Sequence, residues 1–474
     1  MTSTRFGLKL VFATGAAIVL LWLIATRSLV AYLAETAPDL ALGLNPKDPI
    51  ALLNVAEKTI AAAESEHQKA LAAGSVALPV RMGAGRFAPP AMSDSKAEQE
   101  ILRQATLPPS DARAVTNADL KAARQMIELA LTVEPLSSRA WSMLGRISDL
   151  GPPEATADTF KYYTMAARLS LRESRAIWWL MQRSVETQDY SGALLRADQL
   201  LRTNSRAGPL VFPVLAQMAE TPQANTAVKA LLARNPPWRR QFLVAMVQSI
   251  RDARTPLDVM LALKEAGSEL PTSEVAGYLS FLVSRNLHQL AYYAWLQFLS
   301  PDQLASTGLL FNGSFEQPLS GLVFDWTVSQ GAGTLVQFPS IPGEAGKHAL
   351  RIDFTEGRVQ FGGVTQLVML APGAYVLRGR HKGEIVGKRG LRWRVTCVAP
   401  KRNIIGETPM HLGPAPLWRG FEIEFTVPPD GCEAQQIQLI LDARSTSEQL
   451  VRGTMWYDDL VIARAVGPAA QADR

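Results

Sequence analysis

The feature that most constrains this chain is a change of residue pattern near residue 308. Before it, alanine and leucine recur at helical spacing; after it, short β-rich stretches alternate and are bounded by Gly, Pro or Asp. A period of about 3.6 residues and a period of two residues belong to different secondary structures. We therefore predict a multidomain α plus all-β protein, since 474 residues are too many for one compact core.

Composition and charge narrow the class of protein. Hydrophobic residues make up 47% of the chain and charged residues 19%, as in ordinary globular proteins rather than disordered ones. The net charge is +5, and the 48 basic residues are spread along the sequence. Because nucleic-acid-binding proteins concentrate basic residues on one face, we expect no nucleic-acid partner.

The N-terminus carries an uncharged apolar segment. Residues 10–26 read LVFATGAAIVLLWLIAT, at the short end of what spans a hydrocarbon core of about 30 Å. A cleaved signal peptide is the alternative, because Arg5 and Lys9 precede the segment, but no clean small-x-small cleavage site follows. We expect residues 1–30 to form a cytoplasmic N-terminus and a single-pass anchor in a bacterial inner membrane, with the bulk of the chain in the periplasm.

Helical segments follow the predicted anchor. In residues 31–72 a helix is expected to end at Asn45-Pro46 and another to start after Pro49, because proline breaks a helix interior but fits its first turn. Residues 73–112 are rich in Gly, Pro and Ser, which is typical of a linker or long loop. Residues 113–307 return to the helical pattern.

This second helical stretch nearly repeats itself. The pair Arg139-Ala140 recurs as Arg175-Ala176 and again as Arg206-Ala207, within similar surroundings. The spacing is close to the roughly 34 residues of tetratricopeptide repeats, although the full consensus is not present. Repeats that cannot bury their own faces stack, so we predict an α-helical, tetratricopeptide-like solenoid.

Residues 308–467 are predicted to form a β-sandwich, and residues 468–474 a tail. Six β-rich stretches support the sandwich: RVQFGGVTQLVML, YVLRGRHKG, LRWRVTCVA, FEIEFTVPP, QIQLILDAR and TMWYDDLVIA. Alternation in LRWRVTC places Leu391, Trp393 and Val395 on one face with Cys397, which we expect to be the core face.

Two cysteines, Cys397 and Cys432, both fall within this predicted sandwich. No CxxC pair or Cys/His cluster accompanies them, so a metal site of that kind is not indicated. In an oxidising compartment we expect them to form a disulfide. Two buried free thiols are the alternative.

Ordered motifs in the predicted sandwich resemble a known family. They are Asn312-Gly313-Ser314-Phe315-Glu316, then Trp326, then the stretch GKHAL at 346–350, and then GTMWYDDL at 453–460. The set is similar to that of the jelly-roll carbohydrate-binding modules that accompany cellulases and xylanases. The resemblance covers about a third of the chain and implies a galactose-binding or carbohydrate-binding-module-like jelly roll.

The same resemblance implies a structural calcium ion. In such modules the first and last strands lie side by side and calcium commonly clips them together, which points to Glu316, Asp459 and the carbonyl of Lys347. Calcium favours several oxygen ligands of this kind. Strand alternation sends Asp458 and Asp459 to opposite faces, so only one would enter the site. The alternative is that Glu316 and Asp459 cap turns or pair with an arginine.

Four arginines and a tryptophan are candidates for binding. Arg392 and Arg394 point away from the predicted core, and the preceding strand offers Arg378 and Arg380. On one exposed sheet they would form a basic platform for carboxylate or phosphate groups, which arginine meets in bidentate fashion; ordinary solvated strand faces are the alternative. Trp418 either contacts a glycan or partner or seals the sandwich.

No catalytic motif stands out in the sequence. The GxSxG, HExxH, Walker and GxGxxG patterns are missing or lack their structural context. Nothing singles out the facing carboxylate pair that a glycosidase needs. We therefore expect that the protein is not an enzyme.

The whole chain resembles proteins found with bacterial exopolysaccharide synthesis and export machinery, because it combines an anchor, tetratricopeptide-like repeats and a jelly roll. This implies a periplasmic scaffold whose repeats dock synthesis or export proteins and whose jelly roll contacts an anionic exopolysaccharide or a protein. A polysaccharide-modifying or degrading enzyme with an appended binding module is the alternative. A third reading is an assembly factor whose jelly roll binds no sugar.

Overall fold

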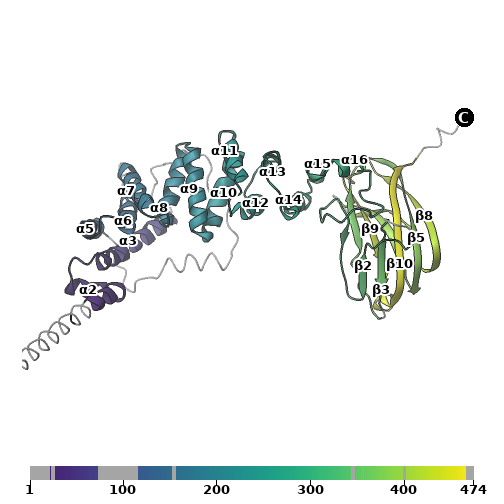
Figure 1. Ribbon diagram of the computed structural model, residues 1–474, viewed down its shortest axis with the longest axis horizontal. Helices are drawn as coiled ribbons and strands as arrows, with labels where there is room; N and C mark the ends of the chain where they lie inside the picture. The colour runs from purple at the N-terminus through teal and green to yellow at the C-terminus, as the bar shows by residue number, and fades with distance from the viewer. Residues whose placement is uncertain are drawn as a thin grey trace, which may run out of the picture. The chain divides into compact units, whose positions relative to one another are not determined.

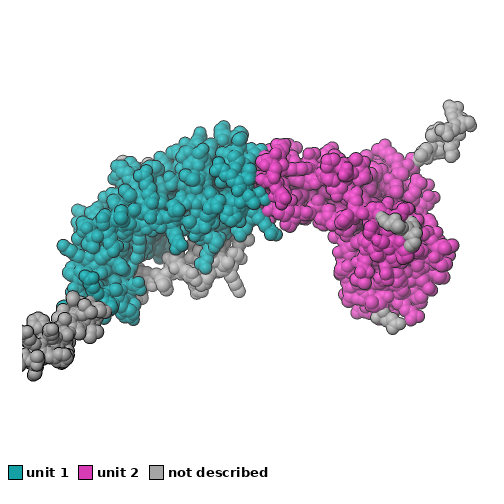
Figure 2. Space-filling model, viewed as in Figure 1, with its two compact units in different colours: residues 1–242 teal, residues 243–474 magenta. Residues whose placement is uncertain are grey.

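The computed structural model describes residues 22, 27–72, 116–151, 156–342, 347–355, 357–398 and 402–465. It divides into two compact units, Met1–Phe242 and Leu243–Arg474 (Figure 2). The first unit is helical, and the second contains helices followed by two β-sheets (Figure 1). The predicted order of helices first and an all-β region second is confirmed.

The predicted membrane anchor, residues 10–26, lies outside the described residues except for Trp22, and so does the predicted linker at 73–112. Within the described ranges, no helix combines the length and the apolar character that crossing a membrane requires.

The first unit is a series of helices, several of which are joined by turns of a few residues (Figure 1). The break at Asn45-Pro46 and the restart at Pro49 are confirmed, with Pro49 as the first residue of its helix. The helices are α2 (Pro38–Leu44), α3 (Pro49–Ala72), α5 (Asn117–Val133), α6 (Ser138–Asp149), α7 (Thr156–Leu169), α8 (Ser174–Glu186), α9 (Tyr190–Thr203), α10 (Gly208–Glu220) and α11 (Pro222–Ala233), and α12 (Arg239–Met246) contains the boundary between the units.

The sequence repeat corresponds to a repeated turn. The turns span residues 45–48, 134–137 and 170–173. In each turn, the first residue donates its N–H to the carbonyl of the residue four positions earlier, and its carbonyl accepts the N–H of the last residue of the turn. The alanines of the repeated Arg-Ala pairs are all buried: Ala140, Ala176 and Ala207. The first unit therefore contains helical hairpins that repeat, and their assignment to the tetratricopeptide family stays a prediction.

Ion pairs join three helices of this unit. The guanidinium of Arg146 on α6 lies 2.9 Å from Glu64 and 2.5 Å from Glu57, both on α3, with only 12% of the arginine side chain exposed. Arg175 on α8 reaches the same Glu64 carboxylate at 2.7 Å. Because Arg146 contacts both carboxylates and Arg175 shares Glu64 with it, α3, α6 and α8 are tied into one network.

The helices of the second unit are packed onto the start of the β region. They are α13 (Thr255–Glu265), α14 (Thr272–Ser284), α15 (His288–Phe298) and α16 (Pro301–Ala305). The Trp295 ring of α15 lies with its centre 5.2 Å from Phe311 and 5.5 Å from Phe324. All three side chains are buried, so the boundary expected at residue 308 falls between elements that share an aromatic cluster.

The β region is a sandwich of two five-stranded antiparallel sheets. The first sheet has the order β1-β4-β9-β6-β7 and the second β2-β3-β10-β5-β8. The strands are β1 (Thr327–Val328), β2 (Thr334–Gln337), β3 (Leu350–Phe354), β4 (Val364–Val368), β5 (Gly373–Gly387), β6 (Leu391–Cys397), β7 (Asn403–Glu407), β8 (Gly413–Val427), β9 (Gln435–Leu441) and β10 (Val451–Arg464).

The core of the sandwich lies between these two sheets. The expected inward face of β6 is confirmed, because Leu391, Trp393, Val395 and Cys397 are all buried. The six β-rich stretches correspond to β4, β5, β6, β8, β9 and β10. Four short strands, β1, β2, β3 and β7, were not singled out by the sequence.

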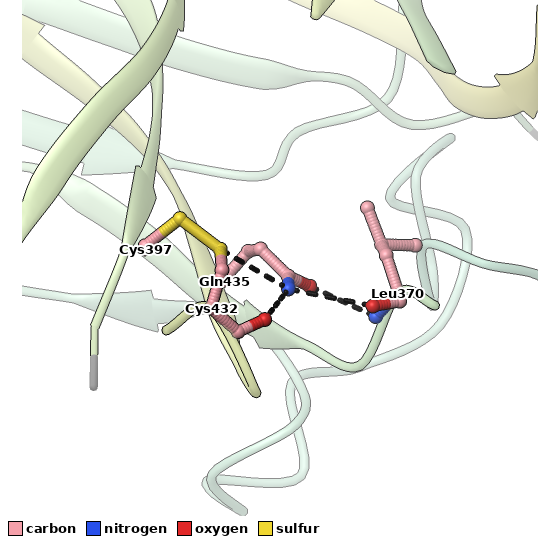
Figure 3. The surroundings of a disulfide bond; sticks show 4 residues. All are labelled: Leu370, Cys397, Cys432 and Gln435. Carbon is pink, nitrogen blue, oxygen red and sulfur yellow. Dashed lines mark hydrogen bonds between the residues drawn. A yellow bond between two sulfur atoms is a disulfide. The ribbon is translucent and has the colours of Figure 1, made fainter. Parts of the chain in front are cut away.

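The disulfide prediction is confirmed. Cys397 at the end of β6 is bonded to Cys432 in the loop before β9, with the two Cα atoms 5.0 Å apart (Figure 3). The buried Gln435 amide donates to the Cys432 carbonyl at 2.7 Å and accepts the Leu370 N–H at 2.8 Å. The disulfide attaches the loop before β9 to the end of β6, and the Gln435 amide attaches it to Leu370 in the loop after β4.

The segment that carries the NGSFE motif closes the sandwich. The N–H of Leu460 on β10 donates to the Gly313 carbonyl at 3.0 Å, and a Cβ at residue 313 would lie 1.9 Å from the Leu460 oxygen. Only glycine therefore fits at this approach of two backbones. Phe315 and Trp326 enter the core, so this segment and the last strand lie side by side.

Candidate functional site

The four candidate arginines do not share a face. Arg378 and Arg380 lie on β5 of the second sheet, whereas Arg392 and Arg394 lie on β6 of the first. Outward side chains of two stacked sheets point away from each other. The expectation of a single four-arginine platform is therefore wrong, because the chain changes sheets between β5 and β6 and strand alternation does not reveal that change.

The arginines of the first sheet are held by carboxylates. Arg392 lies 3.0 Å from Glu407 and 2.9 Å from Asp442, and Arg394 lies 2.5 Å from the same Glu407. All of these side chains are less than a third exposed. The charges of Arg392 and Arg394 are thus largely compensated within the sheet.

The second sheet presents cations and tryptophans in alternation on its outer face. We call Arg351, Trp456, Lys382, Trp418 and Arg380 the cation–tryptophan strip. Trp456 on β10 pairs across with Arg351 on β3 and, on its other side, with Lys382 on β5. The Arg351 guanidinium lies 5.4 Å from the centre of the Trp456 ring.

The strip continues onto β8 through Trp418. The Arg380 guanidinium lies 4.5 Å and the Lys382 ammonium 5.2 Å from the centre of the Trp418 ring. Cations at these distances are attracted by the ring quadrupole and hold the indole in place. Both tryptophans are half-buried, so part of each ring faces solvent.

A bulge in β8 positions Trp418. Arg419 pairs with His381 and Ala415 with Gly383, so Pro416, Leu417 and Trp418 stand opposite the single residue Lys382. Extra residues of this kind re-aim side chains next to functional sites.

Gly383 lies on β5 opposite the bulge, at a position where there is no room for a side chain. It has φ 134°, and a Cβ there would lie 2.2 Å from the Thr454 carbonyl oxygen of β10. The strand can carry this geometry only with glycine at this position.

Carboxylates fix the arginines of the strip. Arg351 pairs with Asp353 at 2.9 Å, and Arg380 pairs with Asp458 at 2.6 Å and Asp459 at 2.9 Å. Burial raises the pKa of Asp458 above its ordinary value, although the hydrogen bond from Arg380 opposes that shift. Among the described residues, Lys382 forms no such ion pair, so no carboxylate compensates its charge.

The expected separation of Asp458 and Asp459 onto opposite faces is wrong. Both carboxylates contact the Arg380 guanidinium. Pairing of β10 with β5 is irregular between Asp458 and Val461, and Asp459 has φ 52°. This left-handed residue interrupts the two-residue period on which the expectation depended.

The predicted calcium ligands lie in two different environments. The Glu316 carboxylate accepts the His348 N–H at 3.2 Å and faces the His348 imidazole at 3.4 Å, while Asp459 pairs with Arg380. In the part of the chain that the structure describes, no group of three or more His, Cys, Asp or Glu could hold a metal. The guanidinium of Arg380 already compensates the Asp459 carboxylate and would repel a calcium ion bound beside it. Calcium bound by Glu316, Asp459 and Lys347 is therefore not supported by this arrangement, and it stays a prediction.

Three members of the strip were missed by sequence reasoning: Arg351, Lys382 and Trp456. Alternation in TMWYDDL places Trp456 on the same face as Thr454, which is the signal that could have identified an outward tryptophan. The sequence does not state which strands are neighbours, and the strip exists only because β3, β10, β5 and β8 are adjacent.

Comparison with known proteins gives similar structures but no family. No protein-family model matches the chain, and no curated protein matches it either. Solved structures that are similar include the CBM22-1 xylan-binding domain of Paenibacillus barcinonensis Xyn10C, at 15% identity, with 32% of this chain and 94% of that chain covered and a TM-score of 0.23. TmCBM61, solved with β-1,4-galactotriose, is 19% identical, with 34% of this chain and all of that chain covered and a TM-score of 0.23.

A third similar structure is Family 16 Carbohydrate Binding Module-2, at 18% identity, with 33% of this chain and all of that chain covered and a TM-score of 0.25. These identities and TM-scores are too low to support an inference about what this chain binds. The functional argument therefore depends on the side chains of the sandwich itself.

Proposed function

We propose that this protein is a glycan-binding adaptor, in which the cation–tryptophan strip binds a polysaccharide and the helical hairpins bind protein partners. One observation carries the proposal: two half-buried tryptophans, Trp418 and Trp456, lie on an open sheet face among fixed hydrogen-bonding side chains. One strand separates β8 from β10, which places the two indoles roughly 10 Å apart across the sheet. A single extended polymer can contact both.

The chemistry of the strip suits sugars. Indole rings offer a large apolar surface against which the C–H face of a sugar ring can pack. Arg351 and Arg380 add several N–H donors, and Asp353 and the exposed Asp459 add acceptors, for sugar hydroxyls. The ion pairs restrain these side chains before binding, which lowers the entropy lost when a ligand binds.

An acidic polysaccharide is the glycan class that we propose. Lys382 stands between the two tryptophans and has no ion-pair partner in the described part of the chain, and the exposed Arg378 lies two residues before Arg380 on the same strand. A carboxylate on the polymer would gain charge-assisted hydrogen bonds there that a neutral polymer lacks.

The proposed setting is the periplasm, with an inner-membrane anchor within residues 1–30 and with exopolysaccharide synthesis or export proteins as partners. The disulfide between Cys397 and Cys432 supports an oxidising compartment. In this setting the protein has no catalytic role, and we expect no new reducing ends when it is incubated with its glycan.

The test is a titration of the full chain with acidic and neutral bacterial exopolysaccharides. We expect binding of an acidic polymer that Trp418→Ala and Trp456→Ala each weaken by about tenfold, the usual effect of losing an aromatic anchor. Leu417→Ala is the matched control, because Leu417 is 76% exposed in the same bulge and is not a member of the strip. Failure of the folded chain to bind any glycan, or weakening by Arg394→Ala but not by the tryptophan variants, would contradict the proposal.

A further inference from the structure

Two imidazoles stack in the sandwich directly under the strip. His381 lies on β5 between Arg380 and Lys382, and its ring is turned inward, away from those two neighbours. Its centre lies 4.1 Å from the ring of His411, and the two planes are 8° from parallel. His411 is 6% exposed and lies just before β8 begins.

The surroundings of the pair are aromatic. The Tyr457 hydroxyl of β10 lies 3.0 Å from Nδ1 of His411, and the Phe421 ring of β8 is centred 4.9 Å from the His411 ring. Nδ1 of His381 and Nε2 of His411 are buried, and neither has a hydrogen-bond partner in the described structure. An imidazolium here would carry a charged N–H with nothing to accept it.

The charged and titratable groups around the pair do not compensate such a charge. From β8, Arg419 stands opposite His381 and is itself positive. From β10, burial holds the pKa of Tyr457 well above its ordinary value, so this hydroxyl stays neutral. Among the residues that the structure describes, no carboxylate contributes to the pKa shift of either imidazole.

The two histidines therefore favour the neutral form. Burial, with a smaller contribution from the neighbouring His381, lowers the pKa of His411 to about 3. Burial, with a contribution from Arg419, also lowers the pKa of His381 below its ordinary value. Both shifts follow from the packing described above.

The pair is mechanically connected to Trp418. His411 is held to β6 by two backbone hydrogen bonds with Leu391, at 2.7 Å and 3.2 Å. The chain then enters β8 at Gly413 and reaches the bulge that carries Trp418. On the other side, His381 pairs with Arg419, the residue next to Trp418. Separation of the two imidazoles would displace the bulge from both ends.

We propose that the His381–His411 pair is an acid-sensitive latch, whose protonation detaches the start of β8 from β5 and β6 and releases glycan from the strip. The release of glycan rests on the proposed function, whereas the latch itself does not. Both imidazoles are more basic when the segment is open than when it is closed. Closure is therefore fully favoured above the ordinary histidine pKa of about 6.5, and it weakens as the pH falls through that value toward the lower pKa of the closed state.

Below about pH 6.5, the equilibrium constant for opening rises about tenfold per pH unit for each histidine that must be neutral in the closed state. His411 alone thus makes opening about 30-fold more favourable at pH 5 than at neutral pH.

The experiment measures amide hydrogen exchange of the full chain by mass spectrometry between about pH 5 and pH 7.5, with rates divided by the intrinsic rate at each pH. We expect peptides within 408–422 to lose protection on acidification. Below about pH 6.5 the equilibrium constant for opening should rise by one to two powers of ten per pH unit, one for each proton taken up; this exponent is the slope compared between variants. His411→Phe is expected to lower that slope by about one. His67→Gln, which removes an exposed histidine on α3, is the control and should leave it unchanged.

The outcomes separate the latch from the proposed function. A slope near zero in the wild-type chain overturns the latch even if His411→Phe does not fold, and so does an equal slope in a folded His411→Phe. If an acidic glycan binds at about pH 7.5, its release at about pH 5 should be lost in His411→Phe; release that persists overturns the regulation of the strip. If no glycan binds at about pH 7.5, the proposed function fails while the exchange slope still decides the latch.

Discussion

A single buried amide, that of Gln366, holds the first segment of the sandwich onto β4. Its oxygen accepts the Phe311 N–H at 3.1 Å, and its nitrogen donates to the Phe311 carbonyl at 2.8 Å. We predict that Gln366→Leu lowers the free energy of unfolding by about 2–5 kcal/mol, because two buried backbone groups lose their partners. Gln438→Leu, at a half-exposed outward position of β9, should change it by no more than about 0.5 kcal/mol. Thermal unfolding of both variants measures this, and equal effects would contradict it.

At the scale of residues, the sequence is informative where one strand's alternation decides the outcome. Leu391, Trp393 and Val395 are buried as alternation predicts. The same rule fails at Asp459, because a residue with positive φ breaks the period. Aspartate enters this region more readily than most residues, but its presence in a strand does not say whether it does so.

At the scale of elements, the disulfide between Cys397 and Cys432 joins separate parts of the sandwich covalently. It closes a loop of sequence separation 35 between β6 and the segment before β9. We predict that replacing Cys397 and Cys432 by serine lowers the free energy of unfolding of the sandwich by about 4 kcal/mol, mainly because the unfolded chain gains conformational freedom. Adding reductant to the wild-type chain should lower the unfolding midpoint toward that of the variant. A midpoint that does not respond in either case would exclude this contribution.

In the helical unit, separate elements are joined by the ion-pair network around Arg146. Removing this side chain leaves the carboxylates of Glu57 and Glu64 on α3 without their shared partner on α6. We predict that Arg146→Ala destabilises the first unit by about 3–5 kcal/mol, as expected when one member of a largely buried ion network is lost. Arg183→Ala is the control, because its pair with Glu186 is mostly exposed and should contribute less than about 1 kcal/mol. Denaturant unfolding compares the two.

Helices and long strands could be predicted from the sequence, but their neighbours could not. The proline signals at Pro46 and Pro49 gave the ends of two helices, because proline acts locally. The placement of β5 and β6 in different sheets depends on pairing between distant segments, which a single sequence does not express. For this reason Trp418 and Arg380 were predicted as candidates, while their assembly with Trp456 into one strip was not.

At the scale of the molecule, the sandwich depends on a helix outside it. Trp295 of α15 covers Phe311 and Phe324, and all three side chains are buried. We predict that a fragment starting at residue 308 is less stable than the second unit, Leu243–Arg474, by about 3–6 kcal/mol, because two phenylalanines become exposed. Thermal unfolding of the two fragments checks this, and equal midpoints would show that the helices add nothing to the sandwich.

The place of the last strand sets the order in which the chain can fold during its synthesis. β10 lies between β3 and β5 in the second sheet, as Figure 1 shows in yellow beside them, and β9 lies between β4 and β6 in the first. Until the residues up to Arg464 have emerged, β3 and β5 each present an unpaired inner edge. Such edges invite pairing with other chains. The helices can therefore fold while the chain is still being made, but the cation–tryptophan strip is complete only when the final strand, β10, is inserted.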